Sequence, residues 1–181
     1  MRVSREVAQE NRQKVVDEAA RLFRIHGYEG IGISGLMKAA GMTHGGFYKQ
    51  FPDKTALMVE ATQAAMAQHE KDWARRLEKA GGDRLEAFRQ AYLHDSHLTR
   101  VGAGCVLPAL AAEAPRHGEA LQSAFAEGLE KLADLVAPED RAVALSTIAQ
   151  VVGALMLARA AGDHPVADQV IAAVGGKADE G

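Results

Sequence analysis

The chain holds a single cysteine among its 181 residues, which excludes an intrachain disulfide framework. Aromatic residues make up 5% of the sequence, too few to build an aromatic cage around a ligand. No apolar run approaches the length of a membrane span, since residues 151–157 form the longest candidate and Arg159 follows closely. The first residues also lack the apolar stretch of a secretion signal. We therefore expect a globular, cytoplasmic protein without a membrane segment.

Charge is nearly balanced, but it is unevenly distributed. Residues 1–60 carry nine Lys or Arg and seven Asp or Glu, a balance of +2, whereas the net charge of the whole chain is −3. The remaining residues, 61–181, therefore carry a balance of −5. A basic N-terminal part ahead of an acidic body is typical of a small protein that binds nucleic acid with its N-terminal part.

Apolar residues recur at helical spacing along most of the chain. Val15, Ala19 and Phe23 fall on one face of a helix that Asn11 would cap and Gly27 would end. No segment shows the sustained period-two alternation of a strand. The sequence therefore predicts an all-α fold. In the N-terminal half, helices are expected at about 11–26, 34–40, 43–51 and 54–80, and a capping box at 83–86 opens the next one. Further helical segments are expected at 105–114, after Pro115, at 139–161 with Pro138 in the first turn, and from Pro165 to an end at Gly175 and Gly176.

The helix expected at 54–80 divides the chain into two parts. We expect an N-terminal helix-turn-helix domain over residues 1–52 and a helical body over 53–181. Because one continuous helix would join them, the two parts would be mechanically coupled rather than loosely tethered.

Residues 34–51 contain two short helical segments separated by a turn at Gly41. Leu36 and Phe47 can fill the angle between the segments, which is the spacing of a helix-turn-helix. In such a motif the second helix enters the major groove of DNA. Its first turn would contain Gly45 and Gly46, although glycine costs about 1 kcal/mol relative to alanine inside a helix. Two glycines at this place favour close approach to DNA over simple packing.

The same segment resembles the DNA-binding domain of the TetR family of transcriptional regulators. The stretches AARLFRIHGYEG and LMKAAGMTHGGFYKQFPDKTAL carry the resemblance, which spans about residues 11–60. Matching positions are Ala19, Ala20, Leu22, Phe23, Gly27, Tyr28, Ala39, Ala40, Gly41, Tyr48, Phe51, Lys54 and Leu57. Many members have Thr or Ser before the second helix, where this chain has Ile31 and Gly32, so we expect Ser34 to cap that helix instead.

The resemblance implies a set of DNA contacts. Thr43 would cap the recognition helix and bind a phosphate, while His44, Gly45 and Gly46 would face the bases. The phosphate backbone and nearby bases would be held by Tyr48, Lys49 and Lys54.

The resemblance further implies a homodimer that binds an inverted-repeat operator and is released by a small molecule inside the body. The last two helices would form the dimer interface, with candidates Leu145, Ile148, Val152, Leu155, Val166 and Val170. Candidates for the ligand pocket are Trp73, Phe88, Tyr92, Cys105 and Phe125, which favour a small to medium-sized, largely apolar ligand. These inferences together predict a ligand-responsive repressor of transcription.

Other functions remain open from the residues alone. Cys105 follows a glycine at an expected helix N-terminus, which would lower its thiol pKa and suit a redox or electrophile sensor. The plainer alternative is a buried core residue. His94, His97 and His117, with Cys105, form a weak candidate metal site, but a zinc site requires three or four converging ligands. No cofactor loop, carboxylate pair or nucleophile with a base is found, so we expect neither an enzyme nor a bound metal or cofactor.

Overall fold

The computed structural model describes residues 5–175. Within that range the chain folds into α-helices and short 3₁₀-helices without a strand, which confirms the all-α prediction. The elements are α1 (Arg5–His26), α2 (Ile33–Ala39), η1 (His44–Lys49), α3 (Lys54–Ala80), α4 (Arg84–Tyr92), α5 (Asp95–Thr99), η2 (Val101–Ala103), α6 (Leu107–Leu110), η3 (Ala114–Arg116), α7 (Glu119–Val136), α8 (Arg141–Ala161) and α9 (Val166–Gly175).

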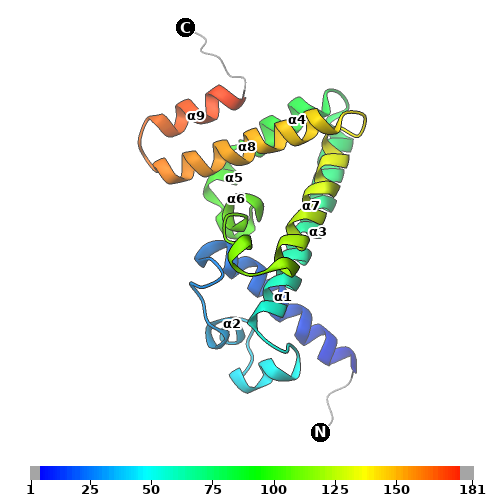
Figure 1. Ribbon diagram of the computed structural model, residues 1–181, viewed down its shortest axis with the longest axis vertical. Coiled ribbons are helices and arrows are strands. Elements are labelled where there is room, and N and C mark those ends of the chain that lie inside the picture. Colours follow the sequence, from blue (N-terminus) through cyan, green and yellow to red (C-terminus); the bar gives the residue numbers. More distant parts are fainter. Residues whose placement is uncertain (1–4, 176–181) are drawn as a thin grey trace.

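The helices form an elongated molecule with the N-terminal elements at one end (Figure 1). Helices α1, α2 and η1 make up a small head, from which α3 runs to the opposite end of the molecule. Helix α7 lies along α3, and α4 and α8 lie across the far end. Helix α9 packs on α8 at the end remote from the head. Helix α3 links the head to the rest of the body, because it runs continuously from one end of the molecule to the other.

Helix α3 has the bounds that the sequence predicts, because both ends are set locally. The Asp53 carboxylate accepts a hydrogen bond from the Ala56 amide at 2.8 Å, and Gly81 ends the helix in the left-handed conformation at φ 58°. Close packing against α7 depends on Gly128, where an added Cβ would lie 2.6 Å from the Met66 Cγ. A side chain at Gly128 would therefore push the two long helices apart.

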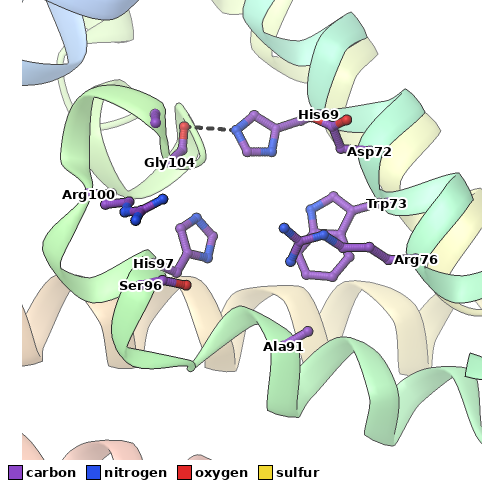
Figure 2. A pocket seen from close by; sticks show the side chains of 10 residues that line it. His69, Asp72, Trp73, Arg76, Ala91, Ser96, His97, Arg100 and Gly104 are labelled. Carbon is purple, nitrogen blue, oxygen red and sulfur yellow. Dashed lines mark hydrogen bonds between the residues drawn. The ribbon is translucent and has the colours of Figure 1, made fainter.

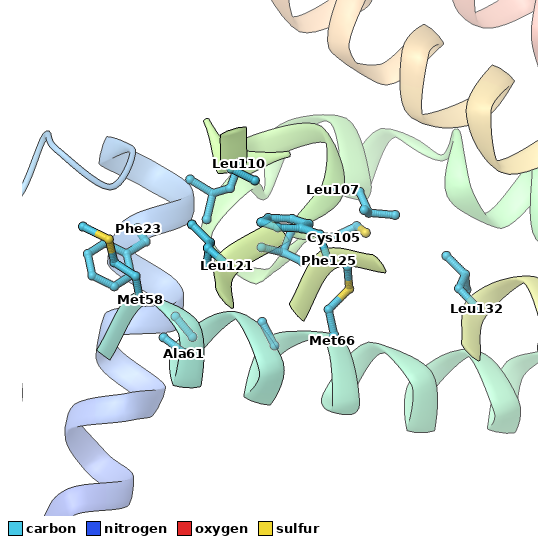
Figure 3. Packing of buried hydrophobic residues seen from close by; sticks show 14 of the residues in the cluster. Phe23, Met58, Ala61, Met66, Cys105, Leu107, Leu110, Leu121, Phe125 and Leu132 are labelled. Carbon is cyan, nitrogen blue, oxygen red and sulfur yellow. The ribbon is translucent and has the colours of Figure 1, made fainter. Parts of the chain in front are cut away.

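One apolar core runs from the head into the body (Figure 3). Phe23 of α1 packs beside Met58 and Ala61 at the start of α3. Further along α3, Met66 faces Phe125 of α7. Because this core is continuous, the head is packed onto the body as well as linked to it through the chain.

Three helix starts differ from the sequence prediction. Helix α1 begins at Arg5, so Asn11 lies inside it and the expected Asn11 cap is wrong. Residues 5–10 are exposed and lack the apolar spacing that would mark them as helical in the sequence. Gly32 is the N-cap of α2, and Ser34 lies inside the first turn, so the expected Ser34 cap is wrong. The recognition segment is a 3₁₀-helix over 44–49 rather than an α-helix over 43–51. Its two glycines weaken the longer helix that the pattern predicts.

The chain between α4 and α7 departs most from prediction. The sequence predicts a helical segment at 105–114, but that range holds only α6 and the first residue of η3, and the short elements α5 and η2 precede it. Pro108 lies in the first turn of α6 and Pro115 lies in η3, so the chain turns repeatedly there. Pro138 precedes α8 rather than lying in its first turn, because Asp140 caps that helix by accepting from the Val143 amide at 3.0 Å.

Helix α8 is the one helix, among the described residues, that is long and apolar enough to cross a membrane. The sequence shows no long uninterrupted apolar run there, since polar residues interrupt the apolar ones. Alternate faces of α8 pack against α4, α6, α7 and α9. These contacts account for the buried apolar residues of α8, whereas Val143, Met156 and Leu157 remain exposed.

Candidate functional site

The head holds α2 and η1 at a fixed angle through a small buried core. Leu36 and Met37 of α2 and Phe47 of η1 are fully buried against one another and against Phe51. Gly41 takes φ 73° between the two helices, and the Met42 amide donates to the Met37 carbonyl at 2.8 Å. This arrangement is a helix-turn-helix in which η1 occupies the recognition position.

The outer face of η1 presents polar and aromatic groups to solvent. Tyr48 is 62% exposed, and its ring lies 6.2 Å from the ring of the exposed His44. A Cβ added at Gly45 would meet nothing within 4 Å, whereas one at Gly46 would lie 3.5 Å from the Met37 Cε. Gly45 therefore faces outward and Gly46 faces α2. Thr43 stands at the N-cap of η1, but its side chain makes no capping hydrogen bond.

The two lysines predicted to contact DNA differ in their surroundings. Lys49 is exposed, and within residues 5–175 it forms no ion pair. The Lys54 Nζ lies 3.4 Å from Glu29 Oε2, and the other carboxylate oxygen, Oε1, lies 3.7 Å from His117 Nδ1. The Glu29 side chain is 71% exposed, and such surface pairs contribute little. Replacement of Glu29 by a phosphate as the partner of Lys54 would therefore cost little free energy.

Polar contacts that no local sequence pattern indicates hold the head against the body. Arg24 of α1 donates from Nε and Nη2 to the Gly102 carbonyl in η2, at 2.9 and 2.6 Å. The Tyr28 amide donates to the Glu113 carboxylate at 3.1 Å, and the buried Tyr28 hydroxyl lies 2.6 Å from the Thr62 hydroxyl. The partners in each pair are far apart in sequence, so no local pattern could reveal them.

A pocket of about 150 Å³ opens in the body between α3, α4, α5 and η2 (Figure 2). Helix α3 contributes His69, Trp73 and Arg76, while the segment 96–104 contributes His97 and Arg100. Its walls are therefore more polar than the sequence predicts. Of the five residues proposed for a ligand pocket, Trp73 alone lines it.

The other four candidates for the ligand pocket are packed in the core. Phe88, Tyr92, Cys105 and Phe125 are all buried and belong to the continuous apolar cluster. The rings of Phe88 and Tyr92 pack against Trp73, with centroids 4.7 and 5.9 Å away. Phe88 and Tyr92 therefore pack against a lining residue of the pocket, and none of the four side chains lines it.

Cys105 does not have the environment of a reactive thiol. It is buried, and burial raises the pKa of the thiol above its ordinary value. The expected lowering by a helix N-terminus is wrong, because α6 begins at Leu107 after an N-cap at Val106. The location and the raised pKa both favour the buried core residue over the redox sensor.

The two histidines at the pocket are fixed as neutral tautomers by backbone groups. The Cys105 amide donates to His97 Nε2 at 2.8 Å, so that nitrogen is an acceptor and the Nδ1–H donates to the Tyr92 carbonyl at 2.9 Å. Burial, with the nearby charges of Arg159 and Arg76, lowers the pKa of His97 to about 4. His69 donates from Nε2 to the Gly104 carbonyl at 2.8 Å, and burial lowers its pKa too.

The lowered pKa of His97 predicts a loss of stability in mild acid. An unfolded chain binds this proton near pH 6.5, whereas the folded protein binds it only near pH 4. Acidification from pH 6.5 to 4 should therefore reduce the free energy of unfolding by about 3 kcal/mol through this one group. Urea unfolding across that range measures the effect, and His97→Gln should have a shallower pH dependence. An equal pH dependence in both proteins would contradict the assignment.

The candidate metal ligands do not come together. His97 bonds to backbone groups around Cys105, His117 packs against Tyr28 with ring centroids 5.3 Å apart, and His94 bonds to Ser96. Over residues 5–175, no group of three or more His, Cys, Asp or Glu side chains is placed to hold a metal ion.

The residues proposed for the dimer interface lie on different faces of α8 and α9. Ile148 and Leu155 are buried inside the protomer, so they cannot line an outer surface, and this part of the expectation is wrong. Leu145, Val152 and Val170 are half-buried, and Val166 is 42% exposed. The outward face of α8 carries other apolar side chains, namely Val143, Met156 and Leu157.

Comparisons with known proteins point to one family. Residues 15–61 match the family model for bacterial regulatory proteins of the tetR family. The chain is 32% identical over 93 residues to the HTH-type transcriptional regulator AcrR of Shigella flexneri, a match that covers 51% of this chain and 43% of that protein. It is 28% identical over 161 residues to LmrA of Bacillus subtilis (strain 168), also an HTH-type transcriptional regulator. That match covers 82% of this chain and 86% of LmrA.

The fold agrees with these matches. The crystal structure of a TetR transcriptional regulator from Chloroflexus aurantiacus J-10-FL is 29% identical to the chain, with a TM-score of 0.69. The superposition covers 93% of this chain and 94% of that one, so the similarity extends from the head through the body.

Proposed function

The chain belongs to the TetR family of bacterial regulatory proteins, and from this premise we propose that it is a homodimeric, cytoplasmic repressor of transcription, without enzymatic activity, released from its operator by a small molecule. Residues 1–52 would contact DNA, and residues 53–181 would bind the ligand and the second subunit. The observation that carries the proposal is the outer face of η1, where His44, Gly45, Tyr48 and Lys49 are all exposed.

These groups suit a major groove in complementary ways. Lys49 and Tyr48 can bond to phosphate oxygens, which supplies affinity for any sequence. His44 can donate to or accept from a base edge, and the bare backbone at Gly45 allows η1 to come close. One such motif contacts few base pairs, so specific binding requires two copies on an inverted repeat.

The outward face of α8 supplies a surface for the second subunit. Met156 and Leu157 are 38% and 61% exposed, and small residues such as Ala149 and Gly153 lie on the same face. Small residues let two helices approach closely, and a two-fold axis would place α8 and α9 against their copies. Apolar side chains that remain exposed in one protomer would then be covered.

Charges on this face should separate the subunits. We expect the double variant Met156→Glu and Leu157→Glu to raise the dissociation constant of the dimer by about 100-fold or more, since each change occurs twice and leaves charges buried. Sedimentation velocity over a concentration series measures the effect. Ala126→Glu, on an exposed position of α7, is the matched control and should leave the dimer intact. A stable dimer in the double variant would exclude this face.

The ligand would act on DNA binding by favouring one of two arrangements of head and body. It can do so only through a difference in affinity between them, and a shift from 1:99 to 99:1 requires about 5.5 kcal/mol. The bonds from Arg24 to Gly102 and from Tyr28 to Glu113 join the two parts and would differ between the arrangements.

Selection of bound duplexes from a random DNA pool tests the proposed function. Recovery of an inverted repeat is expected from the full-length protein, and His44→Ala should change the preferred bases more than the total affinity. No enriched sequence from a folded dimer would contradict the proposal. An unchanged preference in His44→Ala would remove the base contact at that position only.

A further inference from the structure

Two arginines that form no ion pair with any described residue face the pocket in the body (Figure 2). Arg76 and Arg100 point into it from opposite walls. Within the described part of the chain, neither guanidinium forms an ion pair. The one carboxylate at the wall, Asp72, is already bonded to Arg75 and Gln68. Two like charges therefore share a concave space whose described lining residues offer no free carboxylate.

The rest of the wall restricts what can bind there. The Arg76 guanidinium lies over the Trp73 ring, 5.4 Å from its centroid, and Ala91 adds an apolar patch. His97 is neutral because its Nε2 accepts the Cys105 amide, whereas His69 donates from Nε2 to the Gly104 carbonyl and burial lowers its pKa. They use these nitrogens within the fold, so the arginines are the free charged donors.

We propose that this pocket binds a compact carboxylate, with its charged end between Arg76 and Arg100 and its apolar part against Trp73. A guanidinium donates two parallel hydrogen bonds to a carboxylate, a geometry that lysine cannot match. The volume of about 150 Å³ equals that of cavities that hold one benzene ring. A monocyclic or short-chain acid fits this space, whereas a large, wholly apolar ligand does not.

The same pocket is placed to affect the head, and this step rests on the proposed function. Gly104 and Ala103 form one wall, while Gly102 in the same turn accepts both hydrogen bonds from Arg24 of α1. Gly102 also packs under α1, since an added Cβ would lie 2.8 Å from the Ile25 Cδ1. A carboxylate that draws Arg100 toward Arg76 would shift this turn and, through it, the C-terminal end of α1.

Fluorescence of Trp73 tests the binding step directly, because it is the single tryptophan of the chain. The probe is benzoate, titrated into the full-length protein without DNA, with neutral benzamide as its isostere. We expect saturable quenching by benzoate and binding of benzamide at least about 10-fold weaker, the factor that one charge-assisted hydrogen bond supplies. Equal binding of both, no saturable binding of benzoate, or binding of inorganic phosphate in its place would overturn the proposal.

Substitutions identify the residues that hold the charge. Arg76→Gln and Arg100→Gln should each weaken benzoate binding by about 10-fold and leave DNA binding without ligand unchanged. Lys79→Gln removes the same charge from an exposed position on α3 outside the pocket, and it should bind benzoate like the wild type. Unchanged benzoate affinity in both arginine variants would place the carboxylate elsewhere.

The coupling between the pocket and DNA binding is measured separately, as the change in operator affinity when benzoate is added. Benzoate should lower the affinity for the selected operator in the wild type, and Arg24→Lys should bind benzoate normally but lose most of that effect. Equal release in Arg24→Lys would exclude the turn as the link. DNA binding without ligand is measured in parallel, so loss of the proposed function is distinguished from loss of the carboxylate site.

Discussion

Replacement of Gly30 by alanine is expected to destabilise the DNA-binding head by about 3 kcal/mol or more, although Gly30 lies at the surface. A Cβ at this position would lie 1.9 Å from the His26 carbonyl oxygen and 2.8 Å from its carbon. Both atoms belong to the backbone at the end of α1, so no side chain can rotate away. The turn between α1 and α2 would have to move as a whole.

That movement would reach the interior of the molecule. Tyr28 lies in the same turn, is fully buried, and bonds through its hydroxyl to Thr62 of α3. Urea unfolding followed by circular dichroism measures the loss of stability, and operator binding should fall with it. An unchanged unfolding midpoint in Gly30→Ala would show that the turn can adapt.

Gly45→Ala is the matched control, since it makes the same chemical change in the same head. A Cβ at Gly45 would meet nothing within 4 Å, and alanine favours the helical backbone over glycine. We expect the stability to stay equal or to rise slightly. Operator binding should nevertheless weaken, because the new methyl group would stand on the face of η1 that we propose approaches DNA.

The double variant Tyr48→Ala and Lys49→Ala is expected to weaken operator binding by about 100-fold or more, because each change would occur twice in the proposed dimer. Both side chains are exposed, so the stability of the head should not change. Removal of one lysine contact from each subunit should also make the logarithmic salt dependence shallower by about 2. Fluorescence anisotropy with labelled operator, over a series of salt concentrations, measures both quantities.

Lys131→Ala is the control for the change of charge. Lys131 lies on α7, outside the head, and its nearest carboxylate is that of Glu70 at 3.9 Å. It should leave the affinity and the salt dependence unchanged. Near-normal operator binding in the double variant would mean that η1 contacts DNA through other residues.

Features determined by neighbouring residues could be predicted from the sequence. The bounds of α3 follow from Asp53 and Gly81, each of which acts on the helix end beside it. The end of α1 follows from Gly27, whose φ of 75° few other residues adopt. The helix-turn-helix could be recognised because its glycines and apolar residues are close together in the chain.

Features that depend on distant partners could not be predicted in this way. Helix α8 is apolar on several faces, so its spacing does not show that Ile148 and Leu155 point inward while Leu157 points outward. The pocket combines residues of α3 with the segment 96–104, whose short helices have no clear periodicity. The arginines at its wall are ordinary surface residues in the sequence and become notable only when they face each other.

The contact between Glu113 and the Tyr28 amide has a consequence for protein engineering. A regulator with a DNA-binding head and a separate body can be engineered by fusing the head of one protein to the body of another. Here the turn that follows α1 takes its hydrogen bonds from Glu113 and Thr62, and both lie beyond the expected boundary at residue 52. A chimera joined at that boundary would inherit this turn without its supports. Transplantation of the DNA specificity should therefore succeed only when the equivalents of Glu113 and Thr62 are carried along.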